Sequence, residues 1–171
     1  MSVQRLTLAA LLIAIGTLSA HIFYNPAGVS KCFPVQHAIN VLAAVILGPG
    51  YGVAIAFVIS LLRNLLGFGS LLAFPGSMIG ALLAGIMYAR FGSLKSAMFG
   101  EIVGTGLIGG LVSFPIAYYI MGKATVAWFF IPPFLVSTIG GSIIAGLLIR
   151  SGVLRGISSS LLPLKKHKNN M

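Results

Sequence analysis

Acidic residues are almost absent from this sequence, because Glu101 is the only Asp or Glu among 171 residues. Charged residues of both signs make up 7% of the chain, against about a quarter in soluble domains, whose surfaces must be solvated by water. Hydrophobic residues make up 58%, and the mean hydropathy is +1.06. The composition therefore excludes an ordinary water-soluble domain and predicts that most of the chain lies in lipid.

Groups that carry enzymatic chemistry are also missing. A single acid cannot form a pair of catalytic carboxylates, and Cys32, the only cysteine, can form neither an internal disulfide nor a cysteine pair. The sequence contains no Walker-type glycine loop and no His-Glu-x-x-His motif. We therefore expect no enzyme activity, no cofactor and no metal, and any ATP-driven process would need another subunit. We interpret Cys32 as a small apolar loop residue rather than a reactive thiol.

The apolar sequence is divided into runs close to the roughly 20 residues with which a helix crosses a bilayer. We predict helices over about residues 6–23, 34–47, 51–68, 75–91, 97–121 and 130–150. The runs are apolar all round and lack the alternation of a membrane-spanning strand. The sequence thus predicts an all-α fold, in which residues 1–171 form one integral membrane domain built as a six-helix transmembrane bundle. The second helix is short enough to be tilted or only partly spanning.

The Lys and Arg residues are distributed unevenly between the two predicted sides of the membrane. With the N-terminus inside, eight of the 11 fall on the cytoplasmic side, whereas only Lys31 and Lys123 fall in outside loops. Cytoplasmic loops of membrane proteins carry this excess of basic residues. We therefore expect both termini in the cytoplasm, with the basic tail 151–171 against anionic lipid headgroups rather than nucleic acid.

Prolines mark the outer ends of three predicted helices. Pro34, Pro75 and the pair Pro132 and Pro133 stand where the second, fourth and sixth helices begin, and proline suits the first helical turn. The three helix N-termini would then converge on one side of the membrane, each with a partial positive charge. Pro115 should kink the fifth helix near the same rim. We expect an outward-facing cavity at this end.

Polar side chains gather at the same level. The candidates for substrate binding are Gln36, His37, Asn40, Arg63, Asn64 and Ser77. The first three share one face of the second helix. An ionisable residue at this depth costs several kcal/mol unless it faces the interior or water, which makes Arg63 a functional candidate. The alternatives are that Arg63 snorkels or knits loops together, and that His37 is a structural hydrogen-bonding residue.

Aromatic side chains are the second part of the predicted pocket. Phe33, Phe74 and Tyr118 lie in the outer region of the sequence, and aromatic walls with a few convergent polar groups are typical of small-molecule sites. Interfacial aromatic belts are the alternative explanation. We expect the pocket to favour a small, flat and mostly uncharged solute.

Glu101 lies near the predicted cytoplasmic start of the fifth helix. At 1.5 Å per residue, Glu101 is roughly 6 Å and Arg63 roughly 18 Å above the inner face, so we do not expect these two residues to pair. We expect Glu101 to pair with Arg90 or Lys95, or to couple conformational changes. A lone membrane carboxylate could instead be the proton site of a secondary transporter.

Five stretches combine these polar, small and proline residues in a specific order: FPVQHAIN at 33–40, GP at 48–49, LLRNLLG at 61–67, FPGSMIGA at 74–81 and GEIVGTG at 100–106. Together they closely resemble the ThiW family over about residues 6–150. Members of this family are substrate-binding S components of energy-coupling factor transporters and are assigned to the thiazole precursor of thiamine.

The resemblance implies a multi-pass protein of the prokaryotic plasma membrane that captures hydroxyethylthiazole near the outer face. It also implies three partners, namely a transmembrane coupling subunit and two cytoplasmic ATPases. Ala10 and Ala14 match the Ala-x-x-x-Ala element with which such proteins dock on the coupling subunit. The loop over residues 24–33 would close over the ligand. A proton-coupled carrier that uses Glu101 and a non-transporting membrane scaffold are the competing hypotheses.

Overall fold

The computed structural model describes residues 3–22, 25–27 and 30–152. The helices and strands are, in chain order, α1 (Val3–Ile22), β1 (Asn25–Ala27), β2 (Ser30–Cys32), α2 (Pro34–Ile46), α3 (Pro49–Leu65), α4 (Ala73–Phe91), α5 (Leu94–Glu101), η1 (Ile102–Gly109), α6 (Gly110–Pro115), η2 (Ile116–Ile120) and α7 (Ile131–Arg150). The segments α5, η1, α6 and η2 follow one another without a break and form one long helix, in which η1 and η2 are π-helical.

The chain therefore folds as the bundle of apolar helices predicted from its sequence, with boundaries that differ by a few residues. Three helices are long and apolar enough to cross a membrane, namely Ala73–Phe91, Leu94–Ile120 and Ile131–Arg150. The apolar helices Val3–Ser19, Pro34–Ile46 and Pro49–Leu65 are shorter. The antiparallel hairpin of β1 and β2, in which Asn25 pairs with Cys32, is an element that the sequence analysis did not predict.

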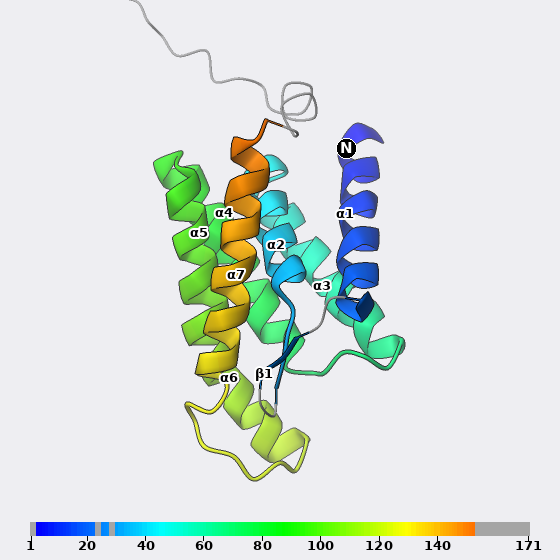
Figure 1. Cartoon of the computed structure of the whole chain (residues 1–171), viewed down its shortest axis with the longest axis vertical. Helices are drawn as coiled ribbons and strands as arrows, with labels where there is room; N and C mark the ends of the chain where they lie inside the picture. The colour runs from blue at the N-terminus through cyan, green and yellow to red at the C-terminus, as the bar shows by residue number, and fades with distance from the viewer. Residues whose placement is uncertain (1–2, 23–24, 28–29, 153–171) are drawn as a thin grey trace, which may run out of the picture.

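Helix α2 lies at the centre of the bundle (Figure 1). Every residue from Gln36 to Ile46 is buried, and α2 contacts α1, α3, α4, α5 and α7. At 1.5 Å per residue its 13 residues extend only about 20 Å. Its first turn, which begins with Pro34, already carries the buried Gln36 and His37, so these two polar side chains lie inside the bundle.

Helix α4 and the long helix approach each other closely through glycine. A Cβ on Gly104 would lie 2.7 Å from the Cα of Gly80, and a Cβ on Gly109 would lie 2.5 Å from the Cα of Gly76. Real side chains do not fit at such distances, so both positions require a residue without one. Small residues spaced four apart allow such backbone contact in membrane proteins, where the hydrophobic effect does not drive helices together.

The two ends of the bundle differ in what they contain. The start of α1 and the end of α7 lie at one end, whereas the β hairpin and the connections from α3 to α4 and from η2 to α7 lie at the other (Figure 1). We call the second the hairpin end. Helices α2, α4 and α7 all begin toward it.

Candidate functional site

A cavity of about 270 Å³ lies at the hairpin end, where α2, α4 and α7 begin. Its wall consists of Phe33, Gln36, His37, Arg63, Phe68, Gly69, Ser70, Leu72, Ala73, Gly76, Ser77, Thr105, Lys123, Phe130, Phe134 and Ser137. The first two turns of the three helices contribute Gln36, His37, Ala73, Gly76, Ser77, Phe134 and Ser137, which agrees with the convergence predicted from the prolines. Five of the predicted binding residues lie on this wall, namely Phe33, Gln36, His37, Arg63 and Ser77.

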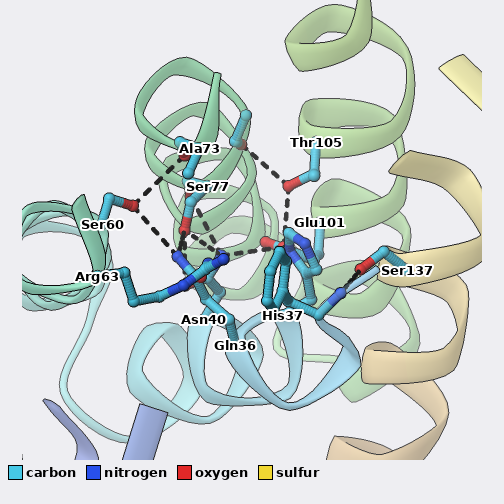
Figure 2. A network of polar contacts seen from close by, with 12 residues as sticks. Gln36, His37, Asn40, Ser60, Arg63, Ala73, Ser77, Glu101, Thr105 and Ser137 are labelled. Atoms are coloured by element: carbon cyan, nitrogen blue, oxygen red, sulfur yellow. Dashed lines mark hydrogen bonds and ion pairs between the residues drawn. The ribbon is translucent and has the colours of Figure 1, made fainter. Parts of the chain in front are cut away.

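Gln36 connects three helices around the cavity. Its Nε2 donates hydrogen bonds to the hydroxyls of Ser60 at 3.2 Å and Ser77 at 2.9 Å. Its Oε1 accepts a hydrogen bond from Nη1 of Arg63. Figure 2 shows the Arg63 side chain extending from α3 toward Gln36 on α2. The amide thus holds α2, α3 and α4 together at the level of the cavity.

Arg63 is only 2% exposed, so it does not snorkel to the surface of the bundle. Its guanidinium carbon lies 3.5 Å from the centre of the Phe33 ring, which places the cation over the aromatic face. Its Nε has no hydrogen-bond partner among the residues that the structure describes. Arg63 therefore faces the cavity with part of its hydrogen-bonding capacity unused.

Asn40 lies directly behind the cavity wall and is fully buried. Its Nδ2 donates to the backbone oxygen of Ser77 at 3.2 Å, to the Ser77 hydroxyl at 3.0 Å and to Oε1 of Glu101 at 3.1 Å. The amide therefore fixes Ser77, which is on the wall, relative to Glu101, which is not (Figure 2).

Glu101 has none of the basic partners that we expected. Its Oε1 lies 2.9 Å from Nδ1 of His37 and accepts a hydrogen bond from the Thr105 hydroxyl at 2.9 Å. The expected pairing with Arg90 or Lys95 was wrong, because α5 begins at Leu94 and the short α2 brings His37 to the depth of Glu101. Glu101 and Arg63 do not pair with each other in the described part of the chain, as predicted.

Three further predicted residues lie outside the cavity wall. The Phe74 ring packs on Phe57, with 5.6 Å between centroids. Tyr118, which is 49% exposed, contacts the ring of Tyr119 at 5.0 Å. Asn64 Nδ2 donates to the backbone oxygens of Ser60 at 2.8 Å and Ser70 at 3.0 Å, so this residue braces the loop after α3.

Sequence reasoning missed the residues at the start of α7 and the lysine in the loop between η2 and α7. Phe130, Phe134 and Ser137 line the cavity, and the Ser137 hydroxyl accepts a hydrogen bond from the Phe33 backbone N–H at 2.8 Å. Their spacing of four and three residues places them on one helix face, which is the signal that could have identified them. Lys123 also lies on the wall, although the sequence indicated only that it belongs to an outside loop.

Cys32 lies beside the site in β2 and is buried. Its Sγ donates a hydrogen bond to the backbone oxygen of Pro133 at 3.4 Å, and burial raises the pKa of the thiol. A raised pKa keeps the thiol protonated and weakly nucleophilic, in agreement with its interpretation as a structural residue. Part of the proposed closing loop, residues 24, 28 and 29, lies outside the described residues.

Ala10 and Ala14 lie at a distance from the cavity, on α1. Both are exposed, whereas Leu8, Ala9 and Leu12 of the same helix pack into the bundle core. The two alanines therefore belong to the face of α1 that is turned away from the rest of the bundle.

Comparison with known proteins gave one finding. A family model described as thiamine-precursor transporter protein (ThiW) matches residues 6–153. No match to a curated protein or to a solved structure was found. The matched range contains all the described residues of the cavity wall.

Proposed function

Because the chain belongs to the ThiW family of thiamine-precursor transporters, we propose that it is the substrate-binding S component of an energy-coupling factor importer whose cargo is hydroxyethylthiazole. In this proposal all six apolar helices lie in the membrane of a prokaryotic cell, both termini face the cytoplasm, and the hairpin end faces outward. The observation that carries the proposal is the cavity of about 270 Å³ at the hairpin end.

The size of the cavity suits a small cargo. Sites for drug-sized ligands measure roughly 300–1,000 Å³, and this cavity lies just below that range. A single thiazole ring with short substituents is therefore a better candidate than thiamine, which carries a second ring. Family membership indicates the same class of compound.

The wall offers complementary groups for such a ring. Phe33, Phe130 and Phe134 provide aromatic faces, while Ser77 and Ser137 provide hydroxyls that donate and accept hydrogen bonds. Gln36 and His37 stand between these two sets on the first turn of α2. Asn40 and Asn64 act behind the wall in this proposal, because they hold Ser77 and the loop after α3. Phe74 and Tyr118, which lie away from the wall, would contact lipid or neighbouring aromatic rings.

The importer would obtain its energy from other subunits. The sequence carries no nucleotide-binding motif, so ATP hydrolysis would take place in two partner ATPases. The exposed Ala10 and Ala14 would allow close helix packing against the coupling subunit. The basic tail would remain at the cytoplasmic lipid surface.

Isothermal titration calorimetry of the detergent-solubilised chain tests the capture step directly. We expect hydroxyethylthiazole to bind with one molecule per chain, and thiamine and unrelated vitamins to bind more weakly. Ser77→Ala should weaken binding by about five-fold to ten-fold, since it removes a hydroxyl from the wall. The matched control is Ser96→Ala, because the Ser96 hydroxyl bonds to Met87 and Ser93 outside the cavity. Absence of heat with every thiazole would overturn the proposed cargo.

A further inference from the structure

Arg63 is a buried cation for which the surrounding protein provides no acid. It is 2% exposed, its guanidinium donates a hydrogen bond to the neutral amide of Gln36, and Nε has no partner among the described residues. A buried charge without an ionic partner costs several kcal/mol. Arg63 contributes to the cavity wall, so an anionic group in the cavity can compensate the positive charge of its guanidinium.

The other charged group on the cavity wall is also positive. Lys123 is a second cation on the wall, and no acidic residue lines it. The only carboxylate in the sequence, Glu101, lies behind the wall with its Oε1 held by His37, Asn40 and Thr105. The two cations on the wall, Arg63 and Lys123, therefore outnumber the one carboxylate behind it. The N-termini of α2, α4 and α7 add partial positive charge at the same place.

We propose that this cavity contains an anion subsite formed by Arg63 and Lys123, so that the thiazole bound most tightly carries a carboxylate or a phosphate monoester in place of a free hydroxyl. The inference rests on the proposed capture of a thiazole, and it replaces hydroxyethylthiazole, as the preferred cargo, with an anionic form of the same ring. The anionic group accepts hydrogen bonds from the Arg63 guanidinium and meets the Lys123 ammonium at the exposed edge of the wall. The ring lies among Phe33, Phe130 and Phe134.

The two cations have different parts in this subsite. Arg63 is buried and its guanidinium is already held in place by Gln36 and Phe33, so it provides fixed donors at little entropic cost. Lys123 is exposed, and its contribution is therefore screened by solvent and salt. The affinity for anionic ligands should fall as the ionic strength rises, whereas the affinity for neutral ligands should not.

Calorimetry with matched pairs of ligands tests the subsite. The first set is hydroxyethylthiazole, its phosphate ester and 4-methylthiazole-5-carboxylate, and the second pair is thiophene-2-methanol and thiophene-2-carboxylate. The thiazole set compares a phosphate with a carboxylate on the same ring. The thiophene pair measures the preference for an anion in the absence of a thiazole ring. We expect each anionic compound to bind at least about ten-fold more tightly than its neutral counterpart, as expected for a charged hydrogen bond.

Two variants test whether Lys123 and Arg63 cause the preference for anionic ligands. Lys123→Gln should weaken binding of the anionic compounds by about three-fold to five-fold and leave the neutral compounds nearly unchanged, because an exposed ion pair contributes little more. Arg63→Gln should remove most of the preference for anions. Lys95→Gln is the matched control for loss of one positive charge, since Lys95 is exposed in α5 and does not line the cavity.

The outcomes separate the subsite from the proposed cargo. Tighter binding of hydroxyethylthiazole than of either anionic thiazole, with equal effects of Lys123→Gln on all compounds, would overturn the subsite and leave the proposed function standing. Binding of thiophene-2-carboxylate without binding of any thiazole would support the subsite and overturn the proposed cargo. Absence of binding by all five compounds would overturn both.

Discussion

At the scale of single residues, the polar groups inside the bundle are matched to one another rather than to water. Glu101 is fully buried, and its Oε1 accepts hydrogen bonds from Asn40 and Thr105 and lies 2.9 Å from Nδ1 of His37. Glu101 Oε2 has no partner among the described residues and lies beside Gly80. The polar contacts of the buried carboxylate are therefore all made through Oε1, and loss of this oxygen would leave the surrounding polar groups without one of their partners.

Replacement of Glu101 tests this dependence. Glu101→Gln keeps an acceptor oxygen for Asn40 and Thr105 and a polar partner for His37, whereas Glu101→Leu leaves Nδ1 of His37 unpaired and should cost about 1–3 kcal/mol more. Thr105 would be affected less, because its hydroxyl also bonds to the backbone oxygen of Gly76. Thermal unfolding of the purified variants in detergent measures the difference. Equal melting temperatures for the two variants would show that the acceptor is not needed.

The sequence identified five of the residues on the cavity wall but not the partner of Glu101. Gln36, His37 and Arg63 could be found because polar side chains in apolar helices must face an interior or a cavity. The partner of Glu101 depends on how deep each helix lies, and that depth follows from the short α2 and the early start of α5. Counting residues from predicted helix ends carries an error of several Å when an end shifts by three residues.

At the scale of elements, the contact between α4 and the long helix determines how closely Glu101 and the cavity wall approach. Gly80 faces Thr105 and Glu101, and Gly76 faces Phe134 and Gly109. Both glycines come from α4, one turn apart, and both meet residues that line the cavity or stand behind it. The glycines thus define the spacing of the site as well as the packing of the helices.

Gly80→Ala should strongly disturb this contact. The new Cβ would lie 2.0 Å from the Thr105 hydroxyl oxygen and 2.6 Å from Glu101 Oε2. Relief requires the buried Thr105 and Glu101 side chains to be displaced or α4 and η1 to move apart, which should cost about 1–3 kcal/mol, as overpacking of a core does. The free energy of unfolding and ligand affinity should both fall. Chemical denaturation of the purified variant provides the measurement.

The control for Gly80→Ala is Gly50→Ala. No atom lies within 4 Å of a Cβ at Gly50, and this residue stands in the first turn of α3. Alanine there should be neutral or slightly stabilising, because it restricts the unfolded chain. Similar losses in both variants would mean that the close approach of α4 and η1 is not the cause.

The elements themselves could be predicted only in part. The helices followed from apolar runs, and the starts of α2 and α7 followed from Pro34 and Pro132. The β hairpin could not be predicted, because strands of three residues are too short to show alternation. The π-helical geometry of η1 and η2 depends on an extra residue per turn in an otherwise helical sequence, and no propensity distinguishes it.

At the scale of the whole molecule, the cavity and the exposed alanines of α1 are separate features. The cavity lies at the hairpin end, whereas α1 begins at the opposite end (Figure 1), and Ala10 belongs to the first half of Val3–Ile22. The proposed importer uses this separation, since cargo enters at one end and the coupling subunit contacts α1. A proton-coupled carrier would need no such contact and would transport as a single chain.

Reconstitution into liposomes distinguishes these mechanisms. The chain alone should bind hydroxyethylthiazole without accumulating it, and uptake should require the coupling subunit, both ATPases and ATP. Ala10→Trp should abolish uptake but preserve binding, because a bulky side chain prevents close helix packing. The matched control, Val136→Trp, adds the same side chain at an exposed position of α7 and should preserve both. Radiolabelled uptake compared with calorimetry gives the two readouts.

Normal uptake by Ala10→Trp would refute docking through α1. Uptake by the chain alone, if Glu101→Gln abolishes it, would establish the proton-coupled carrier instead.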